Sequence, residues 1–124
     1  ISYKYIVILH PSSPLRKSKT IYSACMMMQK YDYNSLISVS ELPFNYKHLA
    51  QPKNNIITNM SVNKALKNND KKYFINGAIY IYKIKFIKDK KSMYFKKNNI
   101  FKMPFSESVD IDTIEDLKLA ERLC

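Results

Sequence analysis

The sequence predicts an α/β domain in which a mostly parallel, twisted sheet is flanked by helices. Short apolar runs rich in β-branched residues, typical of buried strands, alternate with segments whose apolar residues recur at helical spacing. Strands separated by helical segments favour a layered domain with a largely parallel sheet. The 124 residues are 46% hydrophobic, which suffices for one domain with a moderate core. We therefore treat residues 1–124 as a single domain.

The first strand is expected at Tyr3–Leu9, an apolar run with β-branched residues. Residues His10–Lys17 hold two prolines and two serines and are predicted to form a loop. Ser18 can cap a helix that runs from Lys19 to about Tyr31. The apolar face of this helix is formed by Ile21, Ala24, Cys25 and Met28.

A second strand is expected at Ser35–Glu41, where apolar residues alternate with serines. Residues 42–72 are rich in asparagine and lysine and show weak periodicity, so we interpret them as an irregular or hairpin-containing excursion. Tyr73–Tyr82 is predicted to be a strand that is broken at Asn76-Gly77.

The C-terminal third is predicted to hold less sheet. The lysine-rich residues 83–98 are expected to form a helix or loop facing water, and Asn99–Met103 a short strand. Thr113–Leu123 has the spacing of a helix. Its expected core-facing residues are Ile114, Leu117 and Ala120.

Charge and glycine content limit the possible functions. The net charge is +11, but 19 of the 21 basic residues are lysine, whereas nucleic-acid readers usually rely on bidentate arginine contacts. We therefore predict no nucleic-acid partner. Gly77 is the only glycine, where average usage would give about eight or nine, so no glycine-rich phosphate loop is present in these residues.

Cysteine content and hydropathy indicate the compartment. Cys25 and Cys124 form no CxxC motif and no disulfide framework, which favours a reducing environment. No stretch approaches the roughly 20 apolar residues that span a bilayer. We predict a cytoplasmic protein without a membrane partner.

The loop after the first strand is the first candidate for chemistry. Ser12, Ser13 and Arg16 place two hydroxyls and a guanidinium just before a helix, an arrangement that suits a carboxylate or a phosphate. The alternative is a proline-stiffened turn with a solvated arginine.

The break in the third strand is the second candidate. Glycine inside an apolar strand often marks close approach of a ligand or of another backbone segment. Asn76 offers both a donor and an acceptor beside Gly77, and Tyr80 lies two residues beyond Ala78 on the same strand face. The alternative is a β-bulge with Asn76 in a left-handed turn.

The third candidate is the pair Asp110 and Asp112. In an extended segment their side chains point to one face, where two carboxylates suit Mg²⁺ bound to substrate phosphates. Helix capping competes for these residues. Asp112 with Glu115 would form one capping box, whereas Thr113 with Asp116 would form another and leave Asp112 free.

Taken together, the three segments resemble the acylneuraminate cytidylyltransferase family, which comprises the CMP-sialic acid synthetases. The family pattern Gln-Pro-Thr-Ser-Pro-Leu-Arg corresponds to His10–Arg16, with histidine in place of glutamine. The pattern Asn-Gly-Ala-Ile-Tyr is intact at Asn76–Tyr80, and Ser-Ile-Asp-Ile-Asp-Thr corresponds to Ser108–Thr113. The family also has an Arg-Gln pair shortly before the Asn-Gly motif. The corresponding stretch here, near Leu66-Lys67, contains no arginine.

The resemblance implies a nucleotidyltransferase fold of the Rossmann-like type, with an excursion at roughly residues 42–75 that forms a homodimer. It implies that CTP and a nonulosonic acid, of the sialic or legionaminic type, give the CMP-sugar and pyrophosphate. Asp110 and Asp112 would hold Mg²⁺ and serve in catalysis. The implied substrate-binding residues are Ser12, Ser13, Arg16, Asn76 and Tyr80.

The resemblance also implies that this chain is the C-terminal part of such an enzyme. The family's glycine-rich, lysine-containing CTP loop would precede Ile1, so we expect the isolated chain to be inactive. The main alternative is a non-catalytic remnant that keeps the fold and the dimer surface. A glycosyltransferase with a DxD metal motif would explain Asp110 and Asp112, but not the other two segments.

Overall fold

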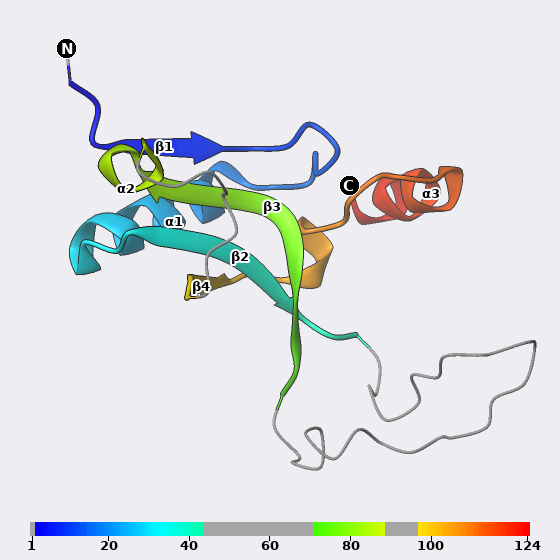
Figure 1. Cartoon of the computed structure of the whole chain (residues 1–124). Coiled ribbons are helices and arrows are strands. Elements are labelled where there is room, and N and C mark those ends of the chain that lie inside the picture. The colour runs from blue at the N-terminus through cyan, green and yellow to red at the C-terminus, as the bar shows by residue number, and fades with distance from the viewer. Residues whose placement is uncertain (1, 44–70, 89–96) are drawn as a thin grey trace, which may run out of the picture.

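The structure is a computed structural model that describes residues 2–43, 71–88 and 97–124 (Figure 1). None of the helices within these ranges is long and apolar enough to cross a membrane. The elements are, in order, β1 (Tyr5–Ile8), α1 (Ser18–Tyr31), β2 (Ser35–Glu41), β3 (Tyr73–Lys83), α2 (Ile84–Lys88), β4 (Asn99–Lys102), the 3-10 turn η3 (Phe105–Glu107) and α3 (Ile114–Leu123). The α/β class predicted from the sequence is confirmed.

The described sheet is mixed, whereas a mostly parallel sheet was expected. Its strand order is β1-β3-β2-β4, and β3 runs antiparallel to both of its neighbours. Only β2 and β4 pair in parallel, although β1, β2 and β4 share one direction. The physical reason is that β3 returns directly beside β2, with Glu41 opposite Tyr73, and antiparallel neighbours need no crossover.

The excursion expected at 42–75 is shorter at its C-terminal end. Tyr73, Phe74 and Ile75 pair with β2 and belong to the sheet. The backbone N–H of Leu42 donates to the carbonyl oxygen of Lys72 at 2.9 Å, which holds the two ends of the excursion side by side. Residues 44–70 lie outside the described part of the chain, so the predicted dimerisation role stays a prediction.

The hydrophobic core is divided between the two faces of the sheet. On one face, α1 packs against the sheet. The buried residues of this cluster are Ala24, Met28, Leu36, Ala78, Ile79, Ile81 and Met103. On the other face, Tyr80 and Tyr82 pack with Ile37, and Ile87 of α2 covers this cluster. From Ile79 to Tyr82, alternate β3 residues thus face opposite layers, as a two-residue repeat requires.

The predicted apolar face of α1 is confirmed, but its predicted cap is wrong. Ala24 and Met28 are fully buried, and Ile21 and Cys25 pack at the edge of the same cluster. Ser18 is already inside the helix, and Lys17 occupies the N-cap position without a side-chain cap. The start of α1 is instead held by contacts with Glu107, described below.

Helix α3 begins with the second of the two capping boxes considered above. The hydroxyl of Thr113 accepts from the backbone N–H of Asp116 at 3.2 Å, and the Asp116 carboxylate accepts from the N–H of Thr113 at 2.8 Å. Ala120 is buried as expected, but Ile114 and Leu117 are 57% and 39% exposed. The reason is that α3 stands beyond one end of the sheet and does not lie across it (Figure 1).

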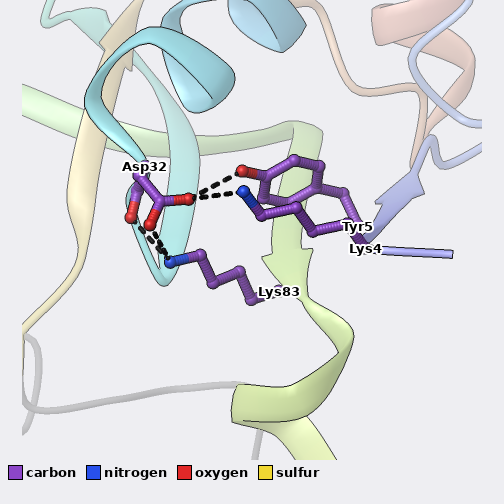
Figure 2. Close-up of polar contacts among 4 residues, drawn as sticks. All are labelled: Lys4, Tyr5, Asp32 and Lys83. Carbon is purple, nitrogen blue, oxygen red and sulfur yellow. Dashed lines mark hydrogen bonds and ion pairs between the residues drawn. The ribbon is translucent and has the colours of Figure 1, made fainter.

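A polar cluster ties the C-terminus of α1 to β1 and β3 (Figure 2). Asp32 ends α1 in a left-handed conformation with φ of 50°. Its carboxylate accepts from Lys83 at 2.7 Å, from Lys4 at 2.9 Å and from the Tyr5 hydroxyl at 3.0 Å. These hydrogen bonds, that of Lys83 first, lower the pKa of Asp32 well below its ordinary value.

Asp32→Asn is expected to lower the melting temperature slightly at neutral pH. Asparagine tolerates the left-handed conformation, so the change removes charge without straining the backbone. Because the folded-state pKa is lowered, the stabilisation is present above about pH 4 and is lost as the pH falls below it. Thermal unfolding from pH 7 to 2 should therefore show the two proteins converging in acid. A constant difference across this range would contradict the assignment.

Candidate functional site

A pocket of about 640 Å³ opens beside the middle of β3, near the end of β1. Its walls come from four separate parts of the chain: the residue stretch after β1, the centre of β3, the segment after η3, and α3. The lining residues that matter for chemistry are His10, Asn76, Tyr80, Ser108, Asp110 and Asp116. Among the sequence-predicted site residues, Asn76, Tyr80 and Asp110 are brought together in this lining, whereas Ser12, Ser13, Arg16 and Asp112 are not part of it.

An irregularity in β3 shapes the pocket wall. Ile37 of β2 pairs with Tyr80, but Val39, only two residues on, pairs with Ile75, so β3 holds extra residues between these points. The bulge considered from the sequence is therefore present, but the left-handed residue is Gly77, with φ of 73°, and not Asn76. A Cβ on Gly77 would lie 3.8 Å from the Tyr80 hydroxyl and 3.9 Å from Asp110 Oδ2.

Gly77→Ala is expected to destabilise the protein by about 1–2 kcal/mol, because an L-residue pays this cost in the left-handed region. The space beside Gly77 is sufficient for a methyl group, so the loss comes from the backbone and not from a clash. Gly77→Asn should cost less, since asparagine enters this region more readily. Chemical denaturation of the three proteins measures the order, and equal stability for all three would contradict the argument.

Asn76 is 4% exposed and is held by three hydrogen bonds. Its Oδ1 accepts from the Ser38 hydroxyl at 2.5 Å and from the backbone N–H of Ala78 at 3.1 Å. Its Nδ2 donates to Ser40 Oγ at 2.8 Å. Both lone pairs of Oδ1 and one of the two N–H groups are thus engaged, so the group that Asn76 can offer to the pocket is one N–H donor.

The loop that follows His10 supports the pocket from outside its lining. The fully buried Ser13 places its hydroxyl 3.5 Å from Asp110 Oδ1, and the backbone N–H of Ile111 donates to the Ser12 carbonyl oxygen at 2.8 Å. The Arg16 guanidinium folds back and donates to the His10 carbonyl oxygen at 2.6 Å. Partial burial lowers the pKa of Arg16, and the charge of Asp110 opposes this shift.

His10 enters the pocket as an aromatic wall. Its ring centroid lies 5.5 Å from that of Tyr80, with the planes inclined at 39°. Tyr80 in turn stacks against Tyr82 at 6.4 Å. A flat, partly apolar wall of this kind, in a pocket that also holds the Asp110 carboxylate, suits an occupant with both apolar and polar faces.

The two predicted metal ligands occupy different positions. Asp110 is half-buried and lines the pocket, whereas Asp112 is exposed and its backbone N–H donates to Asp116 Oδ2 at 3.1 Å. No group of three or more histidine, cysteine or acidic side chains converges within residues 2–43, 71–88 and 97–124. Mg²⁺ needs only one or two protein carboxylates when phosphates and water complete its shell, so the Asp110 carboxylate fits the requirement for a primary ligand.

Sequence analysis missed Glu107, which is 8% exposed. Its carboxylate accepts a short hydrogen bond from the Thr20 hydroxyl, and its other oxygen lies 3.6 Å from Lys17 Nζ. Both partners belong to the start of α1, so this buried acid fixes the segment leading to Asp110 against that helix. No local pattern marks a glutamate whose hydrogen-bond partner, Thr20, lies 87 residues away in the sequence.

The sequence matches no protein-family model. It is 30% identical over 128 residues to a CMP-N,N'-diacetyllegionaminic acid synthase from Legionella pneumophila subsp. pneumophila. The match covers 99% of this chain and 55% of the relative, so the chain spans about half the length of the curated relative it matches. This similarity supports a distant relationship to a cytidylyltransferase-like enzyme.

Proposed function

We propose that this chain supplies the sugar-acid pocket of an enzyme that activates a nonulosonic acid with CTP, giving the CMP-sugar and pyrophosphate. The observation that carries the proposal is the meeting of His10, Asn76, Tyr80 and Asp110 in one pocket, although they come from three distant segments. The match to a CMP-N,N'-diacetyllegionaminic acid synthase supports the same chemistry.

In this proposal the pocket binds and orients the sugar acid. Asn76 offers one N–H to a sugar oxygen, and Tyr80 with His10 forms the wall against which the sugar lies. The anomeric hydroxyl attacks the α-phosphorus of CTP in line, and pyrophosphate leaves. The hydroxyl proton passes to Asp110, whose carboxylate accepts a hydrogen bond from the Ser13 hydroxyl. Holding the two reactants in this geometry supplies much of the rate.

We propose Mg²⁺ as the cofactor, with Asp110 as its primary ligand and Asp112 as its second. The bound metal would neutralise the charge of the CTP phosphates. The proposed assembly is a cytoplasmic homodimer, with no nucleic acid or membrane as partner. Ser12, Ser13 and Arg16 lie outside the pocket lining, and we propose that their loop sits near the sugar and the nucleotide.

The experiment that tests this function is pyrophosphate release by the full-length gene product from CTP and Mg²⁺ with a panel of nonulosonic acids, together with calorimetric binding of each acid to this chain. Release with one acid identifies the substrate. Binding without release indicates that the pocket is a sugar-acid site but that the chain does not complete the reaction alone. A protein that folds cooperatively but neither binds a sugar acid nor releases pyrophosphate would contradict the proposal. That result would favour the non-catalytic module.

A further inference from the structure

Beneath the pocket, Ser40 of β2 joins two of its walls. Ser40 is fully buried and does not line the pocket itself. Its Oγ accepts from Asn76 Nδ2 at 2.8 Å, lies 2.8 Å from Ser108 Oγ, and bonds to the Met103 carbonyl oxygen at 3.0 Å. Asn76 and Ser108 both belong to the pocket lining. One hydroxyl therefore connects the β3 wall with the segment that leads to Asp110.

A contact with the backbone of β3 fixes which way the Asn76 amide faces. The backbone N–H of Ala78 can only donate, so the amide atom 3.1 Å from it must be the oxygen. That orientation turns Nδ2 toward Ser40, whose oxygen accepts one of the two N–H groups. Within the described residues the second N–H has no partner. Rotating the amide by half a turn would place two donors against each other at Ala78, which costs the buried groups their bonds.

Each hydroxyl hydrogen of this network can be assigned to an acceptor. If the Ser108 hydroxyl donates to Ser40, the Ser40 hydroxyl is left to donate to Met103, and Ser40 then accepts from both Asn76 and Ser108. If Ser108 instead donates to the Phe105 carbonyl oxygen at 3.1 Å, Ser40 can donate to Ser108 or to Met103. In either arrangement the Asn76 bond survives, because it uses a lone pair of Ser40. The Ser40 hydroxyl therefore donates one hydrogen bond and accepts at least one in either arrangement, and such buried hydrogen bonds hold their members rigidly.

We propose that Ser40 is a positioning residue of the pocket. It holds the Asn76 amide, whose orientation Ala78 sets, so that one N–H is presented to the ligand, and it anchors Ser108, two residues before Asp110. The inference rests on the proposed function only for the identity of the ligand. A ligand that uses this N–H must present an acceptor, such as a hydroxyl, carbonyl or carboxylate oxygen.

The first test is hydrogen exchange of the Asn76 side-chain amide, measured by NMR on the full chain. In the wild-type protein one Nδ2 proton should exchange slowly, because it is bonded inside the protein, and the other quickly. Equal, rapid exchange of both protons would overturn the proposal. This measurement needs no variant and no enzymatic activity.

The second test is Ser40→Ala, which should abolish the slow exchange and shift the backbone amide signal of Asp110. Ser35→Ala is the matched control, since Ser35 is a buried serine on the same strand that does not line the pocket. A folded Ser40→Ala protein whose Asn76 and Asp110 signals coincide with the wild type would overturn the proposal. If this variant does not fold, the wild-type exchange rates decide the question.

The third test separates an effect on KM from an effect on kcat in the pyrophosphate assay. Ser40→Ala should raise the KM of the sugar acid roughly tenfold, the effect of one lost hydrogen bond, and leave the KM of CTP unchanged. A fall in kcat with no change in the KM of the acid would contradict the role assigned to Ser40. A wild-type protein that neither binds a sugar acid nor releases pyrophosphate would contradict the proposed function instead, and the exchange measurements would still decide the inference.

Discussion

Replacing Asp110 with alanine should reduce pyrophosphate release by on the order of 100- to 1,000-fold, as loss of one preorganised charged group at a reacting centre does. Asp110 is the acidic residue that lines the pocket and also contacts the loop after β1, through Ser13 at 3.5 Å. The loss should fall on kcat, because the carboxylate acts on the reacting groups. Steady-state kinetics with the identified sugar acid measures it.

Two further carboxylate variants make this prediction specific. Asp110→Asn keeps the shape of the side chain and should be nearly as inactive as alanine, because charge is what is removed. Glu115→Ala, an exposed acid in the first turn of α3 outside the pocket lining, should leave the rate unchanged. Asp112→Ala should have an intermediate effect if it is the second metal ligand. An Asp110→Ala protein as active as the wild type would exclude the assigned role.

Met28→Ala should lower the free energy of unfolding by about 2–5 kcal/mol, since it leaves a cavity in the core. The Met28 side chain is fully buried, and it belongs to the cluster in which α1 packs against Leu36, Ile79 and Ile81. A loss of this size is a large part of the 5–15 kcal/mol that typically separates folded from unfolded states. Urea unfolding followed by circular dichroism measures the change.

Met26, two residues before Met28, provides the control for this experiment. Met26 lies on the same helix but is 45% exposed, so Met26→Ala should change stability by less than about 0.5 kcal/mol. Both variants make the same change in composition and helix propensity, and they differ only in burial. Equal effects of the two substitutions would show that α1 does not pack against the sheet as described.

Much of the fold follows from local pattern. The helical spacing of Ala24 and Met28 predicted the buried face of α1, and Ser35–Glu41 was bounded correctly by its alternation. The alternation in β2 does not show where its serines lie, and the structure buries Ser35, Ser38 and Ser40. Burial of those serines depends on partners in β3 and after β4, which local periodicity does not contain.

Strand direction and helix contacts also needed the assembled structure. An apolar β-branched run is compatible with either direction, so the sequence did not reveal that β3 is antiparallel to its neighbours. Ile114 and Leu117 have helical spacing but lie on a helix beyond the end of the sheet, where they stay exposed. A periodic pattern predicts an apolar face and not what covers it.

The sequence by itself determined the α/β class, the main helices and strands, and the segments in which chemistry is expected, because these depend on residue type and short spacing. Only the tertiary structure decided that Asp110 joins Asn76 and Tyr80 in one pocket while Asp112 stays outside it. It also decided that Gly77, and not Asn76, takes the left-handed conformation. The physical reason is that pocket geometry arises from contacts between residues distant in sequence, such as Ser40 with Ser108 and Thr20 with Glu107, which form only when the sheet assembles.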